Sequence, residues 1–218
     1  MTLLNNLSCV LLLAATAAVS AEPVLRTDDF LVTPKYFNGF EKINTDGRFY
    51  TGGAKPYAEG GVTVTQHHGD TGNDIWVTLG FTEGMRSWYP NGGDHGYTGI
   101  ELTSGDDFTE LSFLFRSWGG GSLQYSLLND GVQVLGGTYD APDSELLIAG
   151  FSGGGFDQVL LRSGSEGTIG DARGQSLQLD SIKAEAAGPL PVPVPEPAGL
   201  ALIGLGLWAL VARRKSVS

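Results

Sequence analysis

The chain has 218 residues, of which 33 are glycine, 10% are aromatic and 17% are charged. These aromatic and apolar side chains are enough for a folded core, which excludes a wholly disordered chain. Between Glu22 and Glu196 the chain holds all 24 acidic residues but only ten of the 13 basic ones, a net charge of −14. Such a surface repels nucleic acid phosphates and anionic lipid headgroups, so we expect no nucleic acid partner. Neutral glycans and divalent cations are compatible with this charge.

The first segment in chain order is an apolar run over residues 10–19 that leads into Val19-Ser20-Ala21. Small residues at this spacing are what signal peptidase requires, so residues 1–21 are predicted to be a signal peptide cleaved between Ala21 and Glu22. A run of about ten residues is too short to cross a hydrocarbon core of about 30 Å as a helix. The single cysteine, Cys9, lies in this segment, so the mature domain has no disulfide.

Residues 22–187 contain short runs in which apolar and polar residues alternate, separated by glycine-rich turns. Alternation with a period of two indicates strands with one buried face. The clearest hairpin has Asn129-Asp130-Gly131 between two such runs, because Asp-Gly supplies the positive φ of a tight turn. We predict an all-β domain, a jelly-roll-like sandwich of two antiparallel sheets with about eight to ten strands. The expected strands include residues 62–65, 75–79, 100–102, 111–115, 123–127, 132–134 and 177–179.

Aromatic residues occur in or beside the glycine-rich turns, where exposed rings are able to stack on sugar faces. The expected glycan-binding residues are the aromatic side chains of Trp88, Tyr89, Tyr97 and Trp118, with Arg86, Asn91 and Asp94 as hydrogen-bonding partners. The alternative is that these rings partly cover the core, since aromatic residues are usually buried.

A second polar segment runs from Gln66 to Asp74 and contains the adjacent histidines His67 and His68. Adjacent side chains of a strand point to opposite faces, so both bind one ion only if the segment is a loop. The sequence contains no zinc-ligand spacing, so a zinc site here would also need His95, and the fold would have to bring His95 close to these histidines. An exposed polar hairpin is the simpler interpretation.

Catalytic motifs are absent from the sequence. It contains no Gly-x-Ser-x-Gly elbow, no His-Glu-x-x-His helix and no cysteine nucleophile in the mature part. A glycosidase needs two carboxylates at a defined separation, and the dispersed acidic residues single out no pair. We therefore expect a protein that is not an enzyme, with a glycan hydrolase as the alternative.

The C-terminal end has three parts. Residues 188–197 have proline at every second position from Pro189 to Pro197, which makes a stiff and extended linker. Residues 198–212 are apolar and uncharged, and as a helix of about 22 Å they make a short membrane span. The tail, residues 213–218, begins with a basic cluster that should stay cytoplasmic.

These three parts resemble the PEP-CTERM sorting signal of Gram-negative, exopolysaccharide-producing bacteria. The resemblance rests on Val194, Pro195, Glu196 and Pro197, the apolar helix, and Arg213, Arg214 and Lys215. It implies recognition by an exosortase and cleavage near Pro-Glu-Pro, after a transient stay in the inner membrane. The protein would then reach the cell surface or the extracellular matrix. A permanent tail anchor is the alternative, whereas sortase and GPI signals do not fit.

Two places in the domain are similar to galactose-binding-like, jelly-roll carbohydrate-binding modules: Phe40-Glu41 and Leu179-Asp180-Ser181-Ile182. The resemblance implies that the first and last strands pair and that Glu41 and Asp180 help to bind a structural calcium, a cation that prefers oxygen ligands. Solvated residues at a strand edge are the alternative, and no other cofactor is expected. The sequence thus predicts a surface or matrix protein that interacts with exopolysaccharide. The alternatives are a purely structural matrix component and the hydrolase.

Overall fold

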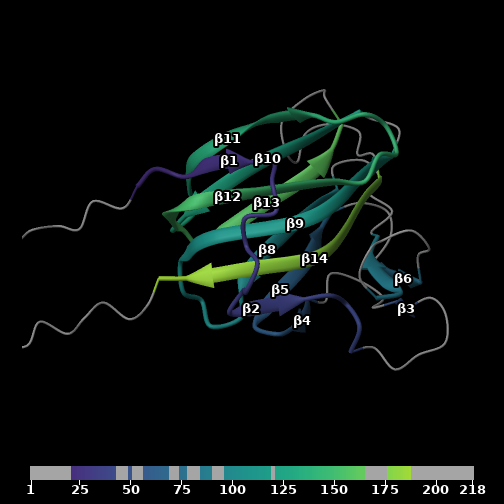
Figure 1. Ribbon diagram of the computed structural model, residues 1–218, viewed down its shortest axis with the longest axis horizontal. Helices are drawn as coiled ribbons and strands as arrows, with labels where there is room; N and C mark the ends of the chain where they lie inside the picture. Colours follow the sequence, from purple (N-terminus) through teal and green to yellow (C-terminus); the bar gives the residue numbers. More distant parts are fainter. Residues whose placement is uncertain are drawn as a thin grey trace, which may run out of the picture. The chain divides into compact units, whose positions relative to one another are not determined.

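The structure is a computed structural model, and it describes residues 21–42, 49–50, 56–68, 74–77, 84–89, 96–118, 121–164 and 176–187. This part of the chain forms fourteen strands in two antiparallel sheets and contains no helix (Figure 1). The predicted all-β sandwich of two antiparallel sheets is confirmed. Among the described residues, no helix is long and apolar enough to cross a membrane. Residues 1–20, the linker at 188–197, the segment 198–212 and the tail at 213–218 lie outside the described residues.

The larger sheet has eight strands in the order β1-β12-β9-β14-β7-β6-β3, and β2 pairs with β14 beside this path. Its long central strands are β9 and β14, which pair antiparallel from Trp118 and Ser176 to Phe108 and Ala186. The strands are β1 (Val24–Arg26), β2 (Tyr36–Asn38), β3 (Phe49–Tyr50), β6 (Asp74–Val77), β7 (Arg86–Trp88), β9 (Phe108–Trp118), β12 (Leu147–Phe156) and β14 (Ser176–Ala186).

The smaller sheet has six strands in the order β11-β10-β13-β8-β5-β4. They are β4 (Tyr57–Glu59), β5 (Val62–His67), β8 (Tyr97–Leu102), β10 (Ser122–Asn129), β11 (Val132–Asp140) and β13 (Gln158–Ser163). The hairpin of β10 and β11 turns at Asp130 and Gly131, whose φ angles of 50° and 76° are both positive. Positive φ at both central residues is what a type I′ turn requires, so the predicted Asp-Gly hairpin is confirmed.

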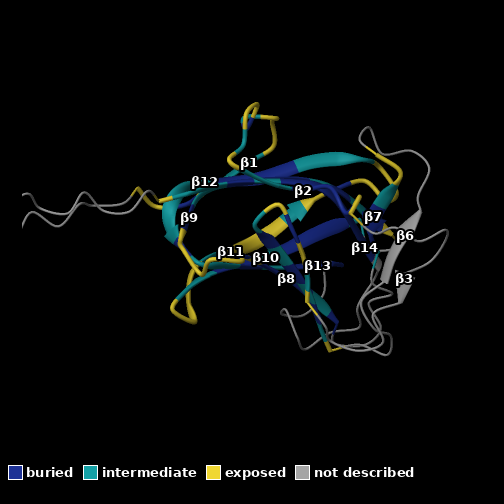
Figure 2. Ribbon diagram, turned by 90° about the horizontal axis from the view of Figure 1, so that it is seen from below, coloured by how far each residue is buried: buried dark blue, intermediate teal, exposed yellow. Residues whose placement is uncertain are grey.

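The core lies between the two sheets, where buried residues of both meet (Figure 2). The ring of Tyr125 in β10 lies 5.1 Å from that of Phe151 in β12, and Tyr139 in β11 lies 6.0 Å from Phe115 in β9, measured between ring centroids. Each of these pairs joins one sheet to the other. Both sheets and all residues of this core lie in one compact unit of the chain, which ends at Ala186.

Trp88 makes a further connection between the sheets. Its side chain is fully buried and stacks on Phe40, with ring centroids 6.1 Å apart. The indole Nε1 donates a hydrogen bond of 3.1 Å to the hydroxyl of Thr98, which lies in the other sheet. That hydroxyl also lies 3.1 Å from the side-chain amide of Gln66 in β5. A buried indole N–H needs such a partner, and here the partner fixes β7 against β8 and β5.

The predicted strands agree with the structure where residues alternate over a sufficient length. Residues 62–65, 100–102, 111–115, 123–127, 132–134 and 177–179 all lie in observed strands, and residues 75–77 lie in β6. The expected number of strands was wrong, because the described residues alone form fourteen. The strands that were not predicted include β1, β2, β4 and β7 with three residues each and β3 with two, which are too short for alternation to be recognised. Two longer strands, β12 and β13, were also not predicted.

Candidate functional site

The structure separates the aromatic residues that the sequence grouped as a glycan site. Trp88 is fully buried between the sheets, so the prediction that its ring stacks on a sugar is wrong for this residue. Tyr89 follows β7 and is half-buried. Trp118 and Tyr97 lie on different sheets, in β9 and β8. Asn91 and Asp94 lie outside the described residues.

Trp118 is an exposed aromatic residue of the larger sheet, with 37% of its surface accessible. The guanidinium of Arg116 lies 5.4 Å from its ring centroid, and its Nε1 donates a hydrogen bond of 3.3 Å to Gln178. Gln178 in turn donates to the hydroxyl of Ser87 over 2.9 Å. Arg86, the other predicted residue of this region, is half-buried at the start of β7.

A row of polar and aromatic side chains crosses the outer face of the smaller sheet. Val64, Ile100, Leu161 and Leu123 point into the core, so their neighbours of alternate parity point outward. The register places His67 opposite Tyr97, and Gln124 opposite both Arg162 and Thr138. Because Leu161 is opposite Thr98, Arg162 comes next to Tyr97. We call this row the outer row: His67, Tyr97, Arg162, Gln124 and Thr138.

Two pairs of side chains give the outer row its geometry. The rings of His67 and Tyr97 are stacked, with centroids 4.9 Å apart and planes inclined by 14°. Arg162 donates from Nη1 to Oε1 of Gln124 over 3.4 Å. Arg162 is only 2% exposed although it points away from the core, and burial lowers the pKa of its guanidinium, which still stays charged at neutral pH.

Gly99 makes room for the stacked rings. It lies on the same outer face, and a Cβ at this position would be 2.8 Å from Nε2 of His67. Such a contact is too short for a side chain to be added without moving the imidazole. The outer row therefore combines a half-buried aromatic pair and the exposed Thr138 with the nearly buried pair of Arg162 and Gln124.

The sequence signalled only part of the outer row. Tyr97 was predicted as a binding residue, and His67 was noted for its histidine neighbour rather than for its ring. Alternation in residues 123–127 does place Gln124 on an outer face. Nothing in the sequence places Arg162 beside Gln124, because they are 38 residues apart and meet only through strand register.

The predicted calcium residues lie where β2, β7 and β14 come together. Oε1 of Glu41 accepts hydrogen bonds from the backbone N–H groups of Met85 and Arg86, at 2.6 and 2.7 Å. Asp180 is fully buried in β14, and its Oδ1 accepts from the N–H of Ser181 at 2.7 Å. Ser181 has a φ of 49°, at a register irregularity of β14. The described residues contain no group of three or more His, Cys, Asp or Glu side chains arranged around an ion.

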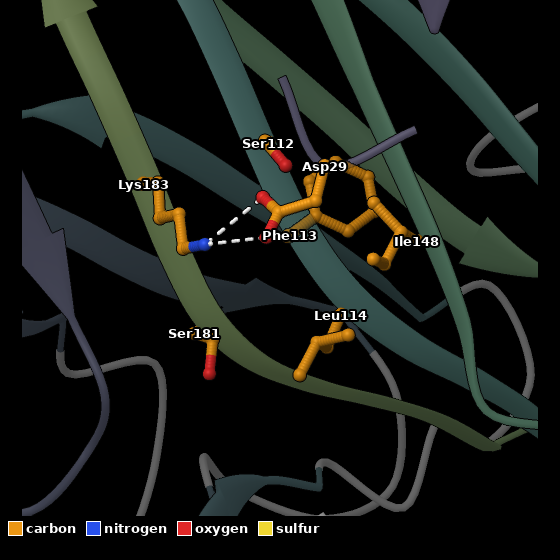
Figure 3. A pocket seen from close by; sticks show the side chains of 7 residues that line it. All are labelled: Asp29, Ser112, Phe113, Leu114, Ile148, Ser181 and Lys183. Carbon is orange, nitrogen blue, oxygen red and sulfur yellow. Dashed lines mark hydrogen bonds and ion pairs between the residues drawn. The ribbon is translucent and has the colours of Figure 1, made fainter. Parts of the chain in front are cut away.

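A separate pocket of about 100 Å³ opens on the larger sheet (Figure 3). Lys183 of β14 reaches across it to Asp29, with Nζ 2.9 and 3.2 Å from the two carboxylate oxygens. Ser112, Leu114, Ile148 and Ser181 complete most of the lining. Phe113 also lines the pocket. Since the two charged groups bind each other, this ion pair attaches the segment after β1 to the sheet.

Comparison with known proteins identifies the C-terminal end. Residues 193–215 match the PEP-CTERM protein-sorting motif. The match includes Val194, Pro195, Glu196 and Pro197 as well as Arg213, Arg214 and Lys215, so the predicted resemblance is confirmed there. The chain is therefore an exported protein that is sorted to the cell envelope or surface, and it carries a PEP-CTERM signal. No curated protein matches it significantly.

Solved structures similar to the domain are carbohydrate-binding modules. The CBM22-1 xylan-binding domain of Paenibacillus barcinonensis Xyn10C is 15% identical, with a TM-score of 0.39, and the match covers 72% of this chain and 97% of that one. A mutant of the family 29 module CBM29-2 is 15% identical, with a TM-score of 0.34 over 66% of this chain and 97% of that one. Another CBM29-2 mutant, complexed with mannohexaose, is 11% identical, with a TM-score of 0.30 over 78% and 100%. These modules are of the class that the sequence resembles, at a distance that leaves the ligand to be argued from the residues of this chain.

The environment of His67 predicts a pH dependence of stability. Burial lowers its pKa, His68 acts in the same direction, and Glu101 opposes both. An unfolded imidazole has a pKa of about 6.5, so below that pH the unfolded chain takes up a proton that the folded domain resists. The free energy of unfolding therefore falls as the pH decreases from about 6.5 toward the lower pKa of the folded state. We expect His67→Phe, which keeps a ring but cannot titrate, to reduce this slope in denaturant titrations.

Glu101→Gln provides the matched control, because it removes the carboxylate that raises the pKa of His67. Its loss of stability on acidification should be steeper than that of the wild type. Identical slopes for the wild type and His67→Phe would show that His67 does not contribute.

Proposed function

We propose that the exported domain binds a neutral exopolysaccharide through the outer row of the smaller sheet. The observation that carries this proposal is the stacked pair of His67 and Tyr97 beside the paired Arg162 and Gln124. The half-buried rings of this pair offer an apolar surface for a sugar ring, and the exposed hydroxyl of Thr138 is able to bond to its hydroxyls. Arg162 and Gln124 are only 2% and 6% exposed, so we assign them a supporting role beside the ligand and not direct contact with it. The net charge of −14 between Glu22 and Glu196 favours a neutral polymer over an acidic one.

The separation of the carboxylates on this face supports glycan binding without hydrolysis. On the described part of this face, Glu101 lies on β8, where it is hydrogen-bonded to Gln158, and Asp140 lies at the end of β11. These strands are three positions apart in the sheet, which is about 14 Å at the usual strand spacing. Glycosidase carboxylates are separated by at most about 9.5 Å. This pair is therefore too far apart for a hydrolase.

The binding proposal predicts a difference between the half-buried Tyr97 and the exposed Trp118, which lie on different sheets. Tyr97→Ala removes the sugar-facing ring of the outer row, and we expect affinity for the exopolysaccharide of the native host to fall roughly tenfold, equivalent to about 1.4 kcal/mol. Trp118→Ala, the matched control on the larger sheet, should bind like the wild type. Affinity electrophoresis or calorimetry with the purified domain measures both, after circular dichroism has verified that each variant folds.

Two other outcomes identify the competing interpretations. Loss of binding in Trp118→Ala alone would move the site to the outer face of the larger sheet, where the sequence also placed candidate residues. Absence of binding in the wild type would favour a purely structural matrix component.

We also propose that Glu41 and Asp180 contribute to a structural calcium site. The support is that two carboxylates, one of them fully buried, adjoin the junction of β2, β7 and β14, and calcium prefers oxygen ligands of this type. Main-chain carbonyls would supply the other ligands.

Calcium at 100 times its dissociation constant should stabilise the wild-type domain by about 2.7 kcal/mol, or roughly 5–10 °C in melting temperature. We expect Glu41→Gln to lose most of this increase. Glu145→Gln, which removes an exposed carboxylate between β11 and β12, should keep it. An equal response of Glu41→Gln and the wild type in calorimetry would show that the site is wrongly placed.

For sorting, we propose transient insertion of residues 198–212 in the inner membrane of a Gram-negative host and cleavage by an exosortase near Pro195-Glu196-Pro197. The support is the sorting motif, together with the short apolar segment that contains Gly199, Gly204 and Gly206 and makes a weak anchor. The basic cluster would keep the C-terminus in the cytoplasm and leave the domain outside.

Replacement of Pro195, Glu196 and Pro197 by alanine should cause an unprocessed form to accumulate in the inner membrane of a host that has an exosortase. Replacement of Pro189 and Pro191, which lie before the matched residues, is the control and should leave processing intact. Mass spectrometry of the surface fraction should detect a peptide that ends near Glu196. Mature protein that still contains Trp208 and Arg213 would show that the tail is a permanent anchor.

A further inference from the structure

The outermost strand of the smaller sheet, β11, has a long free edge. Its nine residues pair with β10 on one side, and among the described residues no strand lies on its other side (Figure 1). Most of its residues are exposed (Figure 2), including Val132 at 68% and Val134 at 41%. Each free edge of this kind presents N–H and C=O groups that are able to pair with another strand.

The sequence of β11 lacks the features that normally prevent edge pairing. From Val132 to Tyr139 it contains no charged residue and no proline, and the nearest charges are Asp130 and Asp140. The other terminal strands, β1, β3 and β4, have only two or three residues each. Short strands, charges, prolines and bulges are the usual protection of an edge. β11 has a bulge at Val134, but from Leu135 to Asp140 it pairs regularly with β10, and up to Tyr139 this part is uncharged and accessible.

We propose that β11 pairs antiparallel with β11 of a second copy of this chain, so that the two smaller sheets become one continuous sheet. This inference is independent of glycan binding. A second copy fits because two domains of net charge −14 repel each other over most of their surfaces, and an uncharged strand is where they are able to approach without burying charge. The twofold symmetry of such a pair makes both partners use the same surface.

Strand register selects one arrangement. Residues that face each other across the pair must point to the same side of the sheet. Leu135 and Tyr139 both pack against the core, and a twofold axis at Gly137 places Leu135 of one copy opposite Tyr139 of the other. The same register places Gly136 opposite Thr138 on the outer side. It also brings Val134, which is the bulged residue of β11 and has no partner on β10, close to Asp140 of the other copy, and this keeps the acidic groups of the two copies apart.

The mature domain contains no cysteine, so introduced cysteines test this register directly. Directly opposed residues have Cα atoms about 4.5–5.5 Å apart, within the range of a disulfide. A mixture of Gly136→Cys and Thr138→Cys domains should give a disulfide-linked dimer on mild oxidation, whereas Gly136→Cys alone should give much less. The side chain at position 136 meets only the flexible end of Gln133, so the variant should fold. Val32→Cys, at an 81% exposed position, mixed with Thr138→Cys is the control.

A charge exchange at Val134 gives a second measurement without crosslinking. Pairing along one strand buries less than the roughly 1,200 Å² of a stable interface, so we expect weak dimers whose fraction rises with concentration in sedimentation equilibrium. Val134→Asp would face Asp140 of the partner and should weaken the dimer at least fivefold, whereas Val134→Lys should keep or strengthen it. A wild-type domain that stays monomeric at millimolar concentration, or a mixture that crosslinks no faster than the Val32 control, would overturn the proposal.

Discussion

The hydrogen bond from the indole of Trp88 to the hydroxyl of Thr98 is the contact on which the rest of the site depends. It crosses the core from the larger sheet to the smaller one, and the hydroxyl continues to the amide of Gln66. Each of these two residues is the sequence neighbour of one ring of the stacked pair: Thr98 follows Tyr97, and Gln66 precedes His67. Because alternate residues of a strand point to opposite faces, the polar chain inside the core fixes the aromatic pair outside it.

This arrangement explains why one tryptophan was assigned the wrong role. Trp88 stands between glycine-rich segments, where the sequence gives it no alternating neighbours that would indicate a buried face. The structure shows that it lies in a three-residue strand whose position is set by contacts with Phe40, which is distant in sequence, and with Thr98, which lies on the other sheet. Local patterns predicted most of the longer strands and the Asp-Gly hairpin because these depend on neighbouring residues, but they missed β12 and β13. The outer row depends on the register of β5, β8, β13, β10 and β11, and register is decided by tertiary contacts.

The domain is defined by its tertiary packing, whereas the C-terminal end is defined by a short linear sequence. The domain depends on a core of buried aliphatic and aromatic side chains without any disulfide, since the single cysteine precedes it. The C-terminal end was recognisable from the order of three short segments, and the match at residues 193–215 required no knowledge of the fold. Sorting could therefore be predicted from sequence alone, whereas the outer row could be recognised only from the arrangement of strands.

A change at Gly99 would alter the outer face of the smaller sheet without altering the core. It belongs to a strand whose inward residues Thr98 and Ile100 are buried, yet the space above its own Cα is filled by the imidazole of His67. The next nearest group after that ring is Leu160, at 3.8 Å, which is ordinary van der Waals contact. A single methyl group here would therefore displace the histidine from Tyr97 and leave the hydrophobic interior as it is. The aromatic surface is thus maintained by the absence of a side chain, and any lineage that acquires alanine at this position would keep a folded, exported domain with a different face.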